Sequence, residues 1–207
     1  MVEASLPGPT RRRRALVLLG AAGALLFGGT LALSAMPVSV SAAPAPDVVV
    51  PDEGVVGADF SPTVADGLVD DGLPLTISNT SAPAIVRLDP DLRRALTEAQ
   101  AMAADDGIRF QITSGWRSEA YQRWLMTDAI ATLGSEEAAR EIVAEADASS
   151  HVTGRAVDIG NLDAQEWLEA YGQGWGLCRT YANESWHFER ATSPGGDCPT
   201  MKTDARG

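Results

Sequence analysis

The sequence SSHVTGRAVD at residues 149–158, followed by ESWH at residues 184–187, contains both histidines of this 207-residue chain. The imidazoles of His151 and His187, together with the carboxylate of Asp158, form a three-ligand set that suits zinc. Three protein ligands leave the fourth position to water, which is typical of catalytic rather than structural zinc sites. A lone histidine is more often a hydrogen-bonded polar residue, but here both histidines lie in short motifs that also contain carboxylates. The two stretches therefore predict that distant parts of the chain converge on one Zn²⁺ ion.

The spacing of the candidate ligands sets conditions on the local fold. His151 and Asp158 are seven residues apart, so a loop residue and a residue of the following strand, 155–159, can converge if the chain turns between them. Gly154 provides a turn at which a Cβ atom could be intolerable. His187 comes 29 residues after Asp158, and its strand must lie alongside the first.

Glu184 is the candidate general base, because a carboxylate near a zinc-activated water can accept its proton. Residues three apart in a strand point to opposite faces. Glu184 and His187 can therefore face one ion only if residues 183–185 form a bend. Two alternatives stay open: Glu184 is a fourth ligand that closes the site, or it is a surface carboxylate.

Arg117 is the candidate anchor for a substrate carboxylate. The chain has a formal net charge of −12, so an anionic substrate is repelled at long range and needs a local cation. Arg117 lies in SGWRS at residues 114–118, between an expected strand and helix, and its guanidinium matches a carboxylate in bidentate fashion. Ser118 and the free N–H groups of the helix start would add to anion binding. The alternative is a solvated arginine paired with a surface acid, and we assign no role to Arg155.

The first 43 residues have the composition of a targeting segment. Four arginines at 11–14 precede an apolar run at 15–36, and small residues follow at 41–43. This order is typical of a secretory signal. The run is also long enough to span a bilayer, which takes roughly 20 residues. We expect either a cleaved signal peptide or a retained anchor, and in both cases an exported domain on the extracellular or cell-wall side.

The remaining chain is long enough for one domain. Cleavage after Ala43 would leave 164 residues (207 − 43) with 12 basic and 27 acidic side chains, a net charge of −15. This balance excludes a basic nucleic-acid-binding surface. We expect a disordered Pro/Ala-rich linker at 44–72, in which valines 48–50 could add a strand, a domain at 73–199 and a frayed tail at 200–207. We expect a monomer that contacts the membrane only through its N-terminal segment.

Hydrophobic periodicity and capping residues predict the fold class. Extended segments are expected at 73–88, helices at 89–107, 118–134, 135–146 and 163–171, and strands at 108–113, 155–159, 175–181 and 185–189. The expected buried helix positions are Leu92, Ala95, Leu96, Ala99, Met102, Tyr121, Trp124, Leu125, Ala129, Ile142, Val143, Ala146, Trp167 and Leu168. Helices and strands without regular alternation indicate an α+β fold with a small antiparallel sheet and flanking helices.

The two cysteines, Cys178 and Cys198, are expected to form a disulfide, because both lie in the exported part and their number is even. The bridge would close a loop that contains Glu184 and His187. Two buried free thiols are the alternative, and the absence of a CxxC spacing argues against a metal role.

The motifs resemble those of a known family. The pattern SxHxxGxAxD at 149–158, followed by ExWH at 184–187, is similar to the zinc D-alanyl-D-alanine carboxypeptidases of the VanY type and to the related D-Ala-D-Ala dipeptidases. SGWRSxxxQ at 114–122 resembles the substrate-binding turn of the same family, which more often has Tyr or Phe in place of Trp116. The resemblance covers about residues 73–190.

This resemblance implies a fold, a function and roles for named residues. The fold is that of the hedgehog and DD-peptidase domains. The implied roles are zinc ligands at His151, Asp158 and His187, a general base at Glu184, and substrate contacts at Arg117, Gln122 and Ser149. The expected activity is zinc-dependent removal of the C-terminal D-alanine from peptidoglycan stem peptides. Two alternatives remain: an L-alanyl-D-glutamate-type peptidoglycan endopeptidase, and a non-catalytic, zinc-stabilised cell-wall-binding domain.

Overall fold

The structure is a computed structural model that describes residues 60–207. The expected signal or anchor, the valines at 48–50 and most of the expected linker lie outside the described residues. Within residues 60–207, the helices are too short or too polar to cross a membrane.

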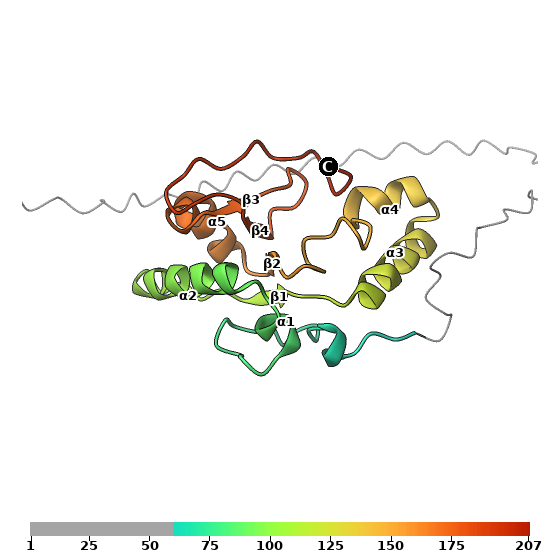
Figure 1. The fold of residues 1–207 in the computed structure, drawn as a ribbon, viewed down its shortest axis with the longest axis horizontal. Helices are drawn as coiled ribbons and strands as arrows, with labels where there is room; N and C mark the ends of the chain where they lie inside the picture. The colour runs from blue at the N-terminus through green and yellow to red at the C-terminus, as the bar shows by residue number, and fades with distance from the viewer. Residues whose placement is uncertain (1–59) are drawn as a thin grey trace, which may run out of the picture. The chain divides into compact units, whose positions relative to one another are not determined.

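A four-stranded antiparallel sheet lies at the centre of the domain (Figure 1). Its strands, in spatial order, are β1 (Ile112–Ser114), β2 (Ala156–Ile159), β4 (His187–Arg190) and β3 (Leu177–Arg179). The sheet and its flanking helices confirm the predicted α+β class with a small antiparallel sheet. In the register of the central pair, Asp158 lies directly opposite His187, so the predicted convergence of the two strands is also confirmed.

Helices cover the sheet in two groups. Figure 1 shows α2 (Pro90–Asp105) and α5 (Leu162–Tyr171) together at one side of the sheet, while α3 (Glu119–Leu133) and α4 (Glu136–Ile142) form a pair at the other. The first group encloses the main core, which includes Leu92, Leu96, Phe110, Ile112, Val157, Ile159, Leu168 and Phe188. The second group has a small core of its own around Met126, Ala129 and Ala139. The strands that contain Asp158 and His187 therefore pack against the larger core through Val157, Ile159 and Phe188.

Capping residues set the helix boundaries where the sequence predicts them. The Asp89 carboxylate accepts hydrogen bonds from the N–H groups of Asp91 and Leu92 at the start of α2, and the Ser118 and Ser135 hydroxyls do the same for α3 and α4. Gly134 ends α3 at φ 70°. Short polar side chains that satisfy free N–H groups are a strong local signal for a helix start.

Several predicted buried faces are wrong. Met102 is 53% exposed, and Ala103 continues the buried stripe of α2 instead. In α3 the buried residues are Gln122, Met126 and Ala129, and only Ala129 was expected. Ile142 is 56% exposed. Helices α3 and α4 pack mainly on each other, so their buried faces depend on this mutual contact more than on hydrophobic periodicity.

The extended segments are shorter than expected. The predicted strand at 108–113 is reduced to β1, because the side chain of Gln100 binds the Ile108 carbonyl and the Phe110 N–H in place of a neighbouring strand. In the segment expected at 73–88, Leu75 pairs with Ile112. Residues Pro83–Val86 form a short helix, α1, with proline in its first turn, where proline is well tolerated.

Both flanks of the expected domain pack against it. The Asp66 carboxylate, in the 3₁₀ helix η1 (Val64–Asp66), accepts a hydrogen bond from the Ser118 hydroxyl at 2.9 Å, so residues 60–72 are not a free linker. At the other end, Lys202 forms a parallel bridge with Tyr181. The expectation of a frayed tail is therefore wrong, although the boundaries at 73 and 199 stay predictions.

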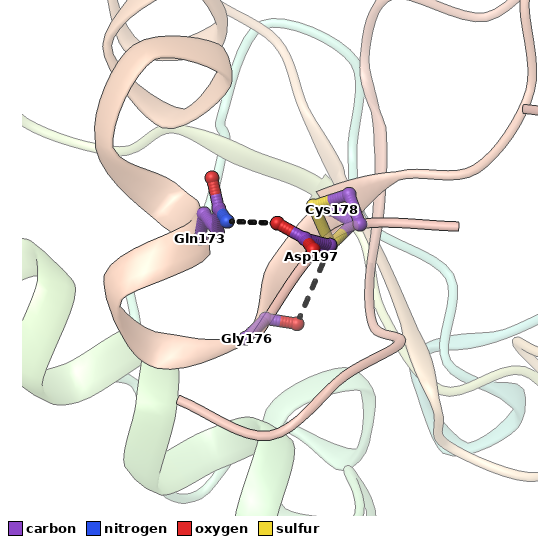
Figure 2. Close-up of a disulfide and its surroundings, with 5 residues drawn as sticks. Gln173, Gly176, Cys178 and Asp197 are labelled. Atoms are coloured by element: carbon purple, nitrogen blue, oxygen red, sulfur yellow. Dashed lines mark hydrogen bonds between the residues drawn. A yellow bond between two sulfur atoms is a disulfide. The ribbon is translucent and has the colours of Figure 1, made fainter. Parts of the chain in front are cut away.

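The predicted disulfide is present. Cys178 and Cys198 are joined at 2.02 Å, 20 residues apart, and Gln173 donates a hydrogen bond to Asp197 beside the bridge (Figure 2). Cys178 belongs to β3. The bridge therefore attaches the segment after β4 to the sheet edge and encloses the loop that carries Glu184.

Removing the bridge should destabilise the domain. The double change Cys178→Ser and Cys198→Ser is expected to lower the free energy of unfolding by about 3 kcal/mol, because the unfolded chain regains the entropy of an open loop. Urea unfolding followed by tryptophan fluorescence measures this. Wild-type protein in strong reductant is the matched control and should lose a similar amount. A loss below about 1 kcal/mol in both would contradict the expectation.

Candidate metal centre and substrate pocket

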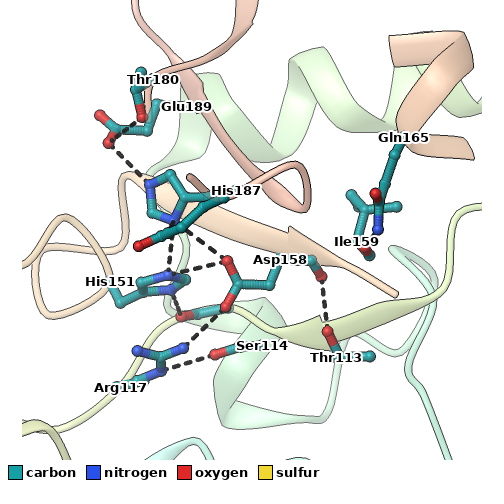
Figure 3. Close-up of polar contacts among 12 residues, drawn as sticks. Thr113, Ser114, Arg117, His151, Asp158, Ile159, Gln165, Thr180, His187 and Glu189 are labelled. Atoms are coloured by element: carbon teal, nitrogen blue, oxygen red, sulfur yellow. Dashed lines mark hydrogen bonds and ion pairs between the residues drawn. The ribbon is translucent and has the colours of Figure 1, made fainter. Parts of the chain in front are cut away.

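Three predicted ligands come together at the centre of the sheet. His151 precedes β2, Asp158 lies in β2 and His187 begins β4. His151 Nε2 lies 3.2 Å from His187 Nδ1 and 3.3 Å from Asp158 Oδ1, and the distance from His187 Nδ1 to Asp158 Oδ1 is 3.2 Å (Figure 3). Ligand atoms at the Zn–N and Zn–O distances of a tetrahedral site are separated by about 3.3 Å. The triangle therefore has the dimensions of three corners of a zinc tetrahedron.

Each imidazole faces the triangle with one ring nitrogen and is oriented by a hydrogen bond at its second ring nitrogen. His151 Nδ1 lies 2.7 Å from the carbonyl oxygen of Gly115, which can only accept, so Nδ1 carries the proton and the lone pair is on Nε2. His187 Nε2 donates to Glu189 at 3.0 Å, and the Thr180 hydroxyl donates to the same Glu189 oxygen. His187 thus faces the site through Nδ1. Such outer partners are a regular feature of metal-binding histidines.

The Asp158 carboxylate supports the metal interpretation independently. Its Oδ2 accepts a hydrogen bond from Arg117, while its Oδ1 is buried without a hydrogen-bond partner and is the one such atom found among the described residues. Buried carboxylate oxygens without partners are costly. A cation at the centre of the triangle would compensate that cost, so the residues present fit Zn²⁺.

The titration behaviour of the three groups suits metal binding in part. Burial and the charge of Arg117 lower the pKa of His151, which favours the neutral, ligating form. Burial would raise the pKa of Asp158, but the imidazoles and Arg117 outweigh it and hold that pKa well below its usual range. For His187, burial lowers the pKa, but the neighbouring carboxylates of Asp158 and Glu189 outweigh it and raise the pKa to about 9. A metal must therefore displace a proton from His187.

Glu184 lies beside the triangle but outside it. The chain bends at residues 182–183 and turns at 185–186, as the predicted bend requires, and Glu184 Oε2 lies 3.6 Å from His187 Nδ1. Glu184 does not belong to the group whose ligand atoms all lie within 4.8 Å of one another. Burial and the neighbouring carboxylates of Asp158 and Glu189 raise its pKa. This position suits a proton acceptor next to the ion better than a fourth ligand.

Arg117 is held in one orientation by three hydrogen bonds. It donates to Ser114 Oγ at 2.8 Å and to Asp158 Oδ2 at 2.9 Å (Figure 3), and to Gln122 Oε1 at 3.2 Å. A guanidinium has five N–H donors, so two (5 − 3) remain for a ligand. The interpretation of Arg117 as a solvated surface residue is wrong, because its side chain is only 16% exposed.

Gln122 and Ser149 lie at the same site but differ in what they offer. Gln122 donates to the Ala144 carbonyl and accepts from Arg117, so its amide orients the guanidinium. Ser149 is buried and lines the pocket. Both residues stay predictions as substrate contacts, and the geometry favours a positioning role for Gln122.

Two hollows meet at the triangle. A small pocket of about 70 Å³ contains the three candidate ligands together with Arg117, Gln122, Val143, Ser149, Tyr181, Glu184 and Ala205. A larger groove of about 560 Å³ also contains Arg117 and Asp158, and it extends along Val69, Asp71, Thr113, Tyr121, Trp124 and Gln165. The site therefore has one confined side and one open side.

The sequence analysis missed Glu189 and Ala205. Glu189 follows His187 by two residues, and alternation along a strand places both on one face, so this signal could have been used. Ala205 has no local signal, because it reaches the pocket through the folding back of residues 199–207.

Comparisons with known proteins identify one matching family and several similar solved structures. Residues 85–191 match the family described as VanY: D-alanyl-D-alanine carboxypeptidase. None of the curated proteins matches the chain. Among solved structures, the chain is similar to a Zn(II)-bound mutant of the vancomycin-resistance D,D-pentapeptidase VanY from a VanB-type cassette (25% identity over 49% of this chain and 71% of that chain, TM-score 0.46). It is also similar to VanYB in complex with D-alanine-D-alanine (24%, 49% and 70%, TM-score 0.46) and to DacB from Streptococcus pneumoniae D39 (26%, 56% and 70%, TM-score 0.42).

Weakening the partner of His187 should weaken metal binding. Glu189→Gln removes the negative charge that the His187 N–H contacts, and zinc affinity is expected to fall about 10- to 100-fold. Competition with a chromophoric chelator measures it. Glu166→Gln, at an exposed position of α5, is the matched control. Equal affinities in the two variants would contradict a role for Glu189.

The raised pKa of His187 predicts how pH affects the metal-free protein. A group whose pKa is raised on folding stabilises the folded state below its unfolded value, about 6.5. That contribution disappears as pH rises through about 9. Denaturant unfolding with chelator present should therefore give a falling stability over this window, and His187→Asn should flatten the profile. A stability that rises through the same window in wild-type protein would contradict the pairing.

Proposed function

Because this chain belongs to the VanY family of D-alanyl-D-alanine carboxypeptidases, we propose that it is a zinc-dependent carboxypeptidase that removes the C-terminal D-alanine from peptidoglycan stem peptides. The observation that carries the zinc part of this proposal is the triangle of His151, Asp158 and His187, with an unpartnered buried oxygen on Asp158. A bound zinc ion would polarise the scissile carbonyl and lower the pKa of a water molecule.

Glu184 acts as general base in the proposed reaction. Its carboxylate accepts the proton of the attacking water and donates it to the amine of the leaving D-alanine. The raised pKa of Glu184 supports this role, because proton transfer is most efficient when the pKa of the catalytic group lies near the working pH. The position of Glu184 in the lining of the small pocket supports the same role, because its carboxylate would then lie beside the reacting atoms.

Arg117 binds the C-terminal carboxylate of the substrate. The contacts with Ser114 and Gln122 hold its guanidinium in place before substrate arrives, so little side-chain entropy is lost on binding. This local cation offsets the repulsion between an acidic protein and an anionic peptide.

The sizes of the two hollows support carboxypeptidase over endopeptidase activity. Gln122 and Ser149 line the small pocket but not the groove, so we assign the C-terminal residue to the small pocket and the rest of the stem peptide to the groove. A pocket of about 70 Å³ suits a short residue, whereas an L-alanyl-D-glutamate endopeptidase has to accommodate chain on both sides of the scissile bond. A non-catalytic wall-binding domain would not need Glu184 beside the triangle.

The proposed location is outside the cytoplasm. The Cys178–Cys198 bridge supports this, because disulfides persist in oxidising compartments. The four arginines at 11–14 and the apolar run at 15–36 that follows them also support export.

Removing the proposed base should abolish turnover but not metal binding. For Glu184→Ala, release of D-alanine from a defined pentapeptide muropeptide is expected to fall about 10²- to 10⁴-fold or more, while zinc content stays near one ion per chain. Mass spectrometry of the digested muropeptide distinguishes loss of one D-alanine from removal of the stem. Glu166→Ala is the control. Turnover at the native rate in Glu184→Ala would overturn the role, and stem removal by the wild type would favour the endopeptidase.

A further inference from the structure

The segment 199–207 lies beyond the family match, which ends at residue 191, yet it packs beside the candidate site. The disulfide at Cys198 fixes its beginning. Lys202 then exchanges backbone hydrogen bonds with the strand that leads to the Glu184 loop: its N–H donates to Thr180, and its carbonyl accepts from Ala182. The segment is therefore anchored to the sheet before it reaches the pocket.

The far end of the segment is attached to α4 through one carbonyl. The Glu141 carbonyl oxygen accepts from the N–H of Ala205 at 3.3 Å and from the side-chain amide of Asn183 at 3.0 Å. Asn183 is the residue immediately before Glu184. Arg206 adds ion pairs with Glu141 and Asp204. One acceptor thus connects α4, the segment and the loop that carries the proposed base.

Ala205 separates two cavities. It lines the small pocket that contains Arg117 and the three candidate ligands. It also lines a second cavity of about 380 Å³, whose other residues are Arg140, Val143, Ala144, Glu145, Ala148 and Arg206. Val143 and Ala144 are shared by both cavities. Ala205 therefore forms, together with Val143 and Ala144, the partition between the small pocket and the larger cavity.

We propose that segment 199–207, through Ala205, is a specificity-determining wall that limits the leaving residue to the size of alanine. This inference rests on the proposed function, because it assigns the C-terminal residue of the substrate to the small pocket. A longer side chain in that pocket would meet Ala205 and Val143. The segment selects its substrate by excluding volume and contacts no reacting atom.

Two variants of the full-length, zinc-loaded chain test the wall in opposite directions. Ala205→Leu extends the wall into the pocket, and a stop after Thr203 removes residues 204–207 and with them the part of the partition that Ala205 forms. Thr203→Ala is the matched control, because it changes an exposed side chain of the same segment and leaves Ala205 and the contacts with Glu141 in place. The substrates are two stem pentapeptides that differ only in the last residue, D-alanine or D-leucine.

The quantity compared is the ratio of kcat/KM for the two peptides within each protein, because this ratio cancels any loss of active enzyme. We expect the truncation to raise the D-leucine to D-alanine ratio at least tenfold over wild type, and Ala205→Leu to lower kcat/KM for D-alanine about tenfold, mainly through KM. Thr203→Ala should keep the wild-type ratio.

The outcomes separate the inference from the proposed function. An unchanged ratio in the truncated protein, with wild-type protein active on the D-alanine peptide, overturns the wall and leaves the proposed function standing. A wild-type ratio near one also overturns the wall. Failure of the zinc-loaded wild type to release D-alanine from the first peptide overturns the proposed function, and the inference with it.

Discussion

The site depends on one cross-strand pair. Asp158 and His187 face each other in the central antiparallel ladder of β2 and β4, so backbone hydrogen bonds hold two candidate ligands at a fixed separation. His151 joins them from the turn before β2, where Gly154 has a φ of 70° and a Cβ would lie 2.5 Å from the Arg87 carbonyl oxygen. A slip of one residue would turn one ligand to the other face of the sheet. The register of β2 and β4 therefore determines whether the metal site can form.

The charges around that pair form one connected system. Arg117 compensates one oxygen of Asp158, while the second oxygen faces the two imidazoles. Glu184 stays at the edge, where burial raises its pKa. A buried carboxylate without these cations would take up a proton. Asp158 can therefore stay ionised while the pKa of the nearby Glu184 is raised, because the two carboxylates have different neighbours.

The features that follow from short-range patterns could be predicted from the sequence. The caps of α2 and α3, the disulfide and the convergence of His151, Asp158 and His187 depend on residue types at fixed spacings. The exposure of Met102 and Ile142 could not be predicted, because it depends on how helices pack on one another. The packing of residues 199–207 was missed for a similar reason. Its backbone contacts with Thr180 and Ala182 leave no periodicity in the sequence.

The two imidazoles are not equally open to adjustment. The proton on His151 is fixed by the main-chain carbonyl of Gly115, which every substitution at that position would retain. The proton on His187 depends on the side chain of Glu189, which a single codon change can shorten to aspartate or neutralise to glutamine. Genetic drift or laboratory selection could thus change the electron-donating strength of His187 in graded steps. The partner of His151 belongs to the main chain and is not open to the same changes.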